Sequence, residues 1–250
     1  MKRHLSLLLL VILALPVCAA AQSHPRIGLV LSGGGARGAA HVGVLKGLEE
    51  MRIPIAAIAG TSMGALVGGA YASGVDVDRL EKELVNADWD DLFVDEPGRA
   101  EWPMRRKADT AQADWDFSLG VRSGGVKLPK GALAGQKVEL FFADLVRGGE
   151  LVEDFDRLPI PYRAVATDLE NGRMRVFADG SLPRAMRASM SLPGVFTPIE
   201  IDQRLYVDGA LVRNLPVDVA RDMAVDLVIA VNVGSSYLPR DQLQSVVGVM

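Results

Sequence analysis

Cysteine, histidine and clustered basic residues are scarce in this chain of 250 residues. The single cysteine, Cys18, lies in an N-terminal segment that we expect to be removed, so the mature chain has no disulfide, thiolate metal site or cysteine nucleophile. No run of four basic residues occurs, and Asp plus Glu outnumber Lys plus Arg by 31 to 27. This charge balance disfavours nucleic acid as a partner.

Long apolar runs are also absent, apart from one at the N-terminus. Lys2 and Arg3 precede an apolar stretch from Leu5 to Val17, and the small residues Ala19–Ala21 follow it. This order predicts a secretory signal peptide over residues 1–21, and hence export through an inner membrane to a secreted, periplasmic or outer-membrane location. The stretch is shorter than the roughly 20 residues of a spanning helix, so an uncleaved anchor is the weaker alternative.

The remainder, residues 22–250, has apolar patterns that alternate between strand and helix periods. The expected strands span 26–32, 53–59, 162–168, 174–178, 200–207 and 227–233. The expected helices span 36–51, 65–73, a segment capped by Asp76 or Asp78 that ends at 86, 136–147, 182–190 and 216–223. This alternation predicts one α/β domain whose largely parallel sheet is covered on both faces. The apolar end at 246–250 has no helix cap, and we expect the natural domain to continue.

The first strand leads into a glycine loop, Gly33-Gly34-Gly35-Ala36-Arg37-Gly38. Such a loop turns tightly and directs several backbone N–H groups, together with a helix N-terminus, at an anion. A dinucleotide site would also need an acidic residue at the end of the second strand, and none occurs between Glu50 and Asp76. The loop therefore favours another anion, with a simple packing turn as the alternative.

The second strand ends in Gly60-Thr61-Ser62-Met63-Gly64, a G-x-S-x-G pattern between a strand and a helix. In a nucleophile elbow, the small flanking residues permit the strained turn that exposes the serine hydroxyl. Two successive strand ends then carry an amide cradle and a serine. The sequence therefore predicts a catalytic serine, Ser62, beside an oxyanion-binding loop.

A nucleophilic serine needs a base, and histidine is the usual one. The chain has three histidines: His4, His24 and His41. The first is lost with the signal peptide, the second adjoins the mature terminus, and His41 is better suited to a local hydrogen bond or a core position. A carboxylate acting directly on Ser62 is therefore favoured. Asp208 is one candidate, although Asp-Gly is also a hairpin signal, and Asp168 and Asp179 are the others.

The two glycine motifs and Asp208-Gly209-Ala210, in this order, resemble the patatin-like phospholipases, and the resemblance extends from about Arg26 to Ser235. It implies a three-layer αβα fold with a mostly parallel central sheet. It also implies Ser62 as nucleophile, Asp208 as proton acceptor, and an oxyanion hole formed by the amides of Gly33, Gly34 and Gly35. Further positions that match the family motifs are Arg37, Gly38, Gly60, Gly64 and Gly209. The segment 189–198 (SMSLPGVFTP) is similar to one near the family's site.

The resemblance implies a lipid acyl hydrolase that needs no cofactor or metal and acts on phospholipid at a membrane surface. A serine esterase for soluble esters and a lipid-binding module with an idle site are the alternatives. The signal peptide is similar to that of the bacterial secreted, autotransporter-like subgroup, in which a membrane barrel follows the patatin domain. Tryptophans and basic residues gather in the irregular segment 96–132 and fit either an interfacial lid or a solvated loop. They are Trp102, Arg105, Arg106, Lys107 and Trp115.

Overall fold

The computed structural model describes residues 25–92, 104, 120–122, 125–127 and 134–234. The predicted signal peptide, most of the segment 96–132 and the apolar end at 246–250 lie outside these residues. The α/β class and the mostly parallel sheet predicted from the sequence are confirmed by the elements described below.

The centre of the domain is a seven-stranded sheet in the order β7-β8-β5-β2-β1-β9, with β6 also paired to β5. Its strands are β1 (Ile27–Leu31), β2 (Ile55–Thr61), β5 (Tyr162–Asp168), β6 (Met174–Phe177), β7 (Ile199–Ile201), β8 (Arg204–Asp208) and β9 (Leu227–Val231). Strands β9, β1, β2 and β5 are parallel, whereas β6 and β8 run antiparallel to β5. A separate two-stranded ribbon is formed by β3 (Gly120–Arg122) and β4 (Gly125–Lys127).

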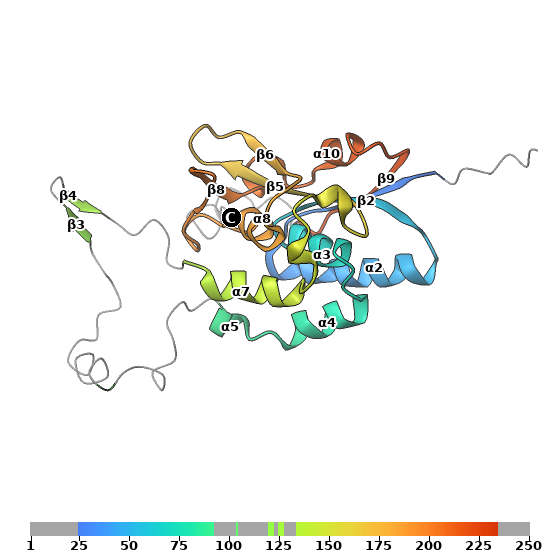
Figure 1. Ribbon diagram of the computed structural model, residues 1–250, viewed down its shortest axis with the longest axis horizontal. Coiled ribbons are helices and arrows are strands. Elements are labelled where there is room, and N and C mark those ends of the chain that lie inside the picture. Colours follow the sequence, from blue (N-terminus) through green and yellow to red (C-terminus); the bar gives the residue numbers. More distant parts are fainter. Residues whose placement is uncertain (1–24, 93–103, 105–119, 123–124, 128–133, 235–250) are drawn as a thin grey trace, which may run out of the picture.

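Helices cover both faces of the sheet, and one face is covered more thickly (Figure 1). On that face, α2 (Ala40–Glu50), α3 (Met63–Ala72) and α8 (Leu182–Ser189) lie against the sheet, with α4 (Val77–Asn86), α5 (Trp89–Leu92) and α7 (Gln136–Leu145) outside them. The other face carries α10 (Val217–Arg221), and α9 (Ala210–Arg213) follows β8 directly. Short 3-10 turns complete the described elements: η1 (Gly35–Ala39), η4 (Gly149–Leu151) and η5 (Phe155–Arg157).

Alternate residues of the central strands enter two apolar cores. Leu29, Leu31 and Ile58 join the large cluster beneath α2 and α3, whereas Val30 and Ala59 pack with α10 on the opposite face. This alternation follows from the period of two in a strand and explains why β1 and β2 are apolar throughout. All these side chains are fully buried.

Four local expectations differ from the structure. The expected strand 200–207 is a hairpin of β7 and β8, because Asp202 and Gln203 adopt positive φ angles of 51° and 63° and reverse the chain. The expected helix 36–51 begins as a 3-10 turn. The final strand is an edge strand among the described residues, with Leu227 55% exposed, and is not covered on both faces. The stretch after 89, expected to be irregular, begins with α5.

Candidate active site

The candidate site lies where the ends of β2 and β8 meet. Both strands pair with the same edge of β5, one after the other along its length. Thr61 at the end of β2 pairs with Val165, and Asp208 at the end of β8 pairs with the next residue, Ala166. The opposite edge of β5 is occupied by β6, so β2 and β8 must share the same edge. Ser62 directly follows Thr61, and the sheet register alone therefore brings it to Asp208.

Ser62 has the backbone of a strained elbow, with φ 54° and ψ −125°. A positive φ is uncommon for a residue with a side chain and is maintained only when the surroundings fix it. The Ser62 N–H donates to Ser189 Oγ at 2.8 Å, and that hydroxyl donates to Val165 O at 2.5 Å. The Ser62 hydroxyl donates to Asp208 Oδ2 at 2.7 Å, and the residue is 8% exposed.

Asp208 is 2% exposed, and its carboxylate is held by hydrogen bonds on both oxygens. The Ala210 N–H donates to Oδ1 at 2.8 Å, opposite the bond from Ser62 to Oδ2. Burial raises the pKa of Asp208 to about 6, and the hydrogen bonds from Ala210 and Ser62 oppose that rise. A carboxylate with this pKa is ionised at neutral pH and is a stronger base than an exposed aspartate.

The elbow is built from close backbone contacts that only glycine permits. A Cβ on Gly60 would overlap the carbonyl oxygen of Gly64, and a Cβ on Gly64 would overlap that of Leu31. These contacts bring β1, the end of β2 and the start of α3 together. Two further glycines of the motifs are also in close contact: Gly38 with the Met63 side chain, and Gly209 with Val165 O.

The glycine loop lies beside Ser62, because a Cβ on Gly33 would be 3.0 Å from the Ser62 Cβ. The Gly33 N–H donates to Asn214 O at 3.3 Å, so it is engaged within the protein and is not open to a substrate oxygen. The amides of Gly34 and Gly35 have no hydrogen-bond acceptor among the described residues. They stand at the start of η1, where Arg37 is exposed.

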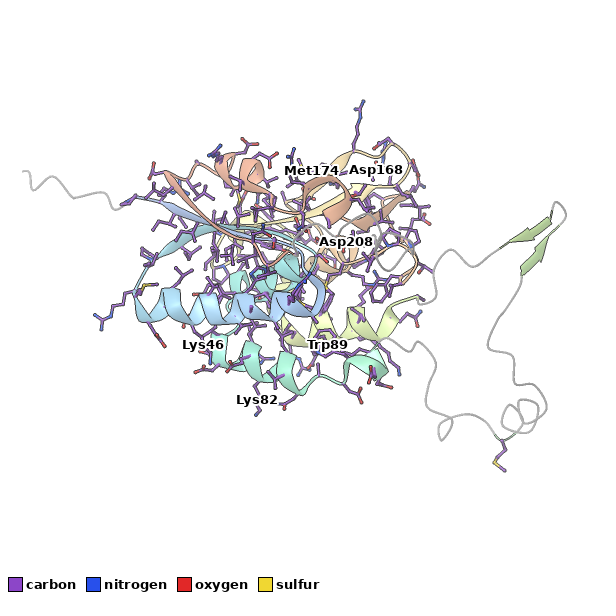
Figure 2. The ribbon with its side chains drawn as sticks, turned by 180° about the vertical axis from the view of Figure 1, so that it is seen from behind. Lys46, Lys82, Trp89, Asp168, Met174 and Asp208 are labelled. Atoms are coloured by element: carbon purple, nitrogen blue, oxygen red, sulfur yellow. The ribbon has the colours of Figure 1, made fainter. Side chains whose placement is uncertain are left out.

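The other candidate bases lie elsewhere. Asp168, at the end of β5, accepts from Arg204 of β8 at 2.6 Å and from Asn171 of the β5–β6 turn at 3.0 Å. Both carboxylates are buried, but Figure 2 shows Asp208 near the middle of the domain and Asp168 towards one end of it. Asp179 is exposed. His41 is buried with Nε2 at 2.8 Å from Ser32 O, which fits the local hydrogen bond expected of it.

Three residues that support the site carry no strong signal in the sequence. Ser189 holds the Ser62 amide, and the carbonyl of Ser191 accepts from the Asp208 N–H at 2.9 Å. Both lie in the segment 189–198, where the family resemblance suggested only proximity. Asn214, at the end of α9, contacts Gly33 through its backbone and its side chain. Nothing in the sequence around Asn214 indicated this contact.

The fold and the site together define an α/β protein with a serine–carboxylate pair at the carboxyl end of a parallel strand. A family model described as patatin-like phospholipase matches residues 29–221. The chain therefore belongs to the patatin-like phospholipase family, as the motifs predicted.

Individual relatives agree with the family. An uncharacterized NTE family protein of Mycobacterium tuberculosis is 37% identical over 215 residues, covering 86% of this chain and 51% of the relative. The human patatin-like phospholipase domain-containing protein 6 is 36% identical over 211 residues, or 84% of this chain and 13% of that protein. The chain thus spans about half the length of the mycobacterial relative. The crystal structure of VipD from Legionella pneumophila has the same fold, with a TM-score of 0.50, 14% identity, and coverage of 77% and 47%.

The described residues contain neither a membrane-spanning helix nor a cluster of metal ligands. None of their helices is long and apolar enough to cross a membrane. Within the same residues, no group of three or more His, Cys, Asp or Glu side chains is arranged to hold a metal ion.

Proposed function

We propose that the domain is a lipid acyl hydrolase of the phospholipase A type, which hydrolyses acyl esters of glycerophospholipids with a Ser62–Asp208 dyad. The observation that carries this proposal is the 2.7 Å hydrogen bond from the hydroxyl of a strained elbow serine to a buried carboxylate. Family membership supports a lipid as the substrate. His41 is the one histidine among the described residues. Because its Nε2 bonds Ser32 O, the group that contacts the Ser62 hydroxyl is a carboxylate and not an imidazole.

In this mechanism, Asp208 accepts the hydroxyl proton while Ser62 Oγ attacks the ester carbonyl. The tetrahedral intermediate collapses, the ester C–O bond breaks, and the leaving alcohol takes the proton from Asp208. Water then attacks the acyl-serine and gives a proton to Asp208, and that proton returns to Ser62 Oγ as the fatty acid leaves. Atoms and charge balance without a cofactor or metal.

The oxyanion of each intermediate would be held by backbone amides of the glycine loop. We assign this role to Gly34 and Gly35, whose N–H groups have no acceptor among the described residues. The Gly33 N–H, the third donor implied by the family resemblance, is instead bonded to Asn214 O. One donor of this kind contributes about 3 kcal/mol to the transition state in other hydrolases, so two account for a large part of the rate.

A lipid surface as the partner is part of the proposal, and Leu211 offers a test of it. Leu211 lies in α9, three residues after Asp208, and is 59% exposed. We propose that this side chain contacts acyl chains when the domain meets a lipid surface. We expect Leu211→Ser to lower the turnover of vesicle phospholipid more than the turnover of a soluble ester.

We also propose that the protein is exported and belongs to the bacterial secreted, autotransporter-like subgroup. Residues 1–21 lie outside the described residues, as does most of the segment 96–132, for which an interfacial lid and a solvated loop are the alternatives. Cleavage of the signal peptide in a bacterial host, measured by mass spectrometry of the exported chain, tests the location. An intact N-terminus in the cytosol would contradict it.

The test of activity is product analysis on defined phospholipid vesicles with wild type, Ser62→Ala and Asp208→Asn. We expect free fatty acid and lysophospholipid from the wild type, and a loss of at least about a thousandfold in each variant, because members of a catalytic unit fail together. Circular dichroism of each variant controls for folding.

Two results would overturn the proposal. Rapid cleavage of short soluble esters with no cleavage of vesicles or micelles would indicate a soluble-ester esterase. A folded wild type whose Ser62 is not labelled by a fluorophosphonate would indicate a lipid-binding module with an idle site.

A further inference from the structure

His41 is a fully buried polar side chain that the proposed chemistry does not use. It lies in the first turn of α2 with no exposed surface, and its Nε2 is 2.8 Å from Ser32 O. A carbonyl oxygen only accepts, so Nε2 carries the proton and Nδ1 does not. Among the described residues, Nδ1 is the one buried side-chain nitrogen or oxygen without a hydrogen-bond partner.

The unpaired Nδ1 makes this buried imidazole unfavourable for the stability of the folded protein. Leaving a buried polar atom unsatisfied costs about 1–3 kcal/mol, and an apolar side chain of similar size would avoid that cost. What the imidazole provides, and an apolar residue could not, is one donor to the carbonyl that precedes the glycine loop. The one hydrogen bond of His41 therefore goes to the backbone at the start of the glycine loop, and none goes to the surrounding core.

The peptide that receives this bond is held from the other side as well. The Gly33 N–H, which belongs to the same Ser32–Gly33 peptide, donates to Asn214 O at 3.3 Å. The Asn214 side chain donates through Nδ2 to Gly33 O at 3.5 Å. The plane of one peptide is therefore fixed at its oxygen by His41 and at its nitrogen by Asn214.

The two holding residues come from the two halves of the site. His41 belongs to the helix that follows the glycine loop, and Asn214 ends α9, which begins two residues after Asp208. We call these contacts of His41 and Asn214 with the Ser32–Gly33 peptide the clamp. The clamp connects the loop that would bind the oxyanion to the segment that carries the proposed base. The next two N–H groups belong to Gly34 and Gly35. Because glycine backbones adopt many conformations, the direction of these N–H groups is otherwise poorly restricted.

We propose that His41 and Asn214 are positioning residues that fix the Ser32–Gly33 peptide and thereby direct the amides of Gly34 and Gly35 at the oxyanion formed on Ser62. This inference rests on the proposed hydrolase function. Oxyanion donors act only when they are held within about half an ångström of the right place, so a loosened clamp lowers kcat and leaves substrate binding unchanged.

The test compares His41→Leu with His41→Gln on a substrate that the wild type hydrolyses. The leucine removes the donor, and we expect kcat to fall about 10–100-fold at an unchanged KM, with a matching fall in the rate of fluorophosphonate labelling. The glutamine side chain retains an N–H of similar reach, and we expect it to recover most of kcat. The pH at which the rate is half-maximal should stay the same, because the base is unchanged.

Leu80→Ala is the control for stability, since Leu80 is a buried residue of α4 away from the loop. It should lower the melting temperature without lowering kcat at a temperature where the protein is folded. If His41→Leu does not fold, Asn214→Ala tests the next peptide instead. It keeps the backbone bond to the Gly33 N–H but removes the bond from Nδ2 to Gly33 O, on the peptide that carries the Gly34 N–H, and we expect kcat to fall about fivefold or more at constant KM.

The outcomes separate the two proposals. A folded wild type that hydrolyses no ester refutes the proposed function. An active wild type whose kcat is unchanged in His41→Leu or Asn214→Ala refutes the clamp alone. A His41→Gln variant as inactive as the leucine variant, or with a displaced pH profile, would show that the imidazole acts in the chemistry, and would also refute the clamp.

Discussion

The buried carboxylate of Asp208, which we propose as the base, should make the folded protein less stable at neutral pH than at acidic pH. Asp208 has its pKa raised from 3.8 to about 6, chiefly by burial. Because one pH unit corresponds to about 1.4 kcal/mol, keeping this carboxylate ionised in the folded state costs up to about 3 kcal/mol. Asp208→Asn removes the charge while preserving the shape, and we expect the inactive variant to be more stable than the wild type at about pH 7.5.

The sign follows from which state holds the proton more tightly. The pKa of Asp208 is higher in the folded protein than in the unfolded chain, so the folded state binds this proton more tightly. The resulting stability is fully present below the unfolded pKa and is lost as the pH rises through about 6. Relative to Asp208→Asn, the wild type should therefore gain about 2 kcal/mol between about pH 7.5 and about pH 4.

Urea unfolding of wild type and Asp208→Asn at both pH values measures this difference. The net advantage of asparagine at the higher pH should be about 1–3 kcal/mol, because its amide must find a new acceptor and its bond from the Ala210 N–H is weaker. Asp179→Asn, on an exposed carboxylate, is the matched control and should follow the wild type. A difference between wild type and Asp208→Asn that is independent of pH would refute the reasoning.

Three other predictions concern the rate and the elbow. The kcat/KM of the wild type should fall about tenfold per pH unit below about pH 6, as Asp208 is protonated, and a profile flat to about pH 5 would contradict this. Ser189→Ala frees the Ser62 N–H and should lower kcat about tenfold in steady-state assays, with Ser189→Thr partly restoring it. Gly64→Ala forces a Cβ against Leu31 O and should yield little folded protein in soluble expression.

The sequence predicted the parts of the site whose residue type is restricted by chemistry or by space. The shortage of histidine favoured a carboxylate as the proposed base, and the glycines of the elbow indicated the strand–turn–helix that contains Ser62. The sequence left Asp168 and Asp179 open because the choice of base depends on strand pairing. That Asp208 and Thr61 face successive residues of β5 is a non-local fact, which no local pattern encodes.

The incorrect predictions about the fold have a similar origin. The turn between β7 and β8 uses Asp202 and Gln203 at positive φ, where Asn-Gly or Asp-Gly would have signalled a hairpin. Conversely, the Asp-Gly pair at Asp208 forms no hairpin, since α9 begins at Ala210 and Gly209 is needed for its close contact with Val165 O. Ser189 and Asn214 support the site by bonding backbone groups of residues far away in the sequence, and no local pattern predicts such contacts.

A direct serine–carboxylate pair makes stricter demands on the backbone than a triad does. An imidazole between the two groups would span the gap and could rotate to fit, whereas here the two side chains must meet at 2.7 Å. Two short side chains can do this only if their Cα positions are fixed, and the end-to-end pairing of β2 and β8 on β5 fixes them. The strain at Ser62 and the buried charge at Asp208 are both unfavourable, so the surrounding core must offset them. The buried apolar cluster under α2, α3 and α8 provides that stability, which is why the site lies at the edge of the largest core and not in a loop.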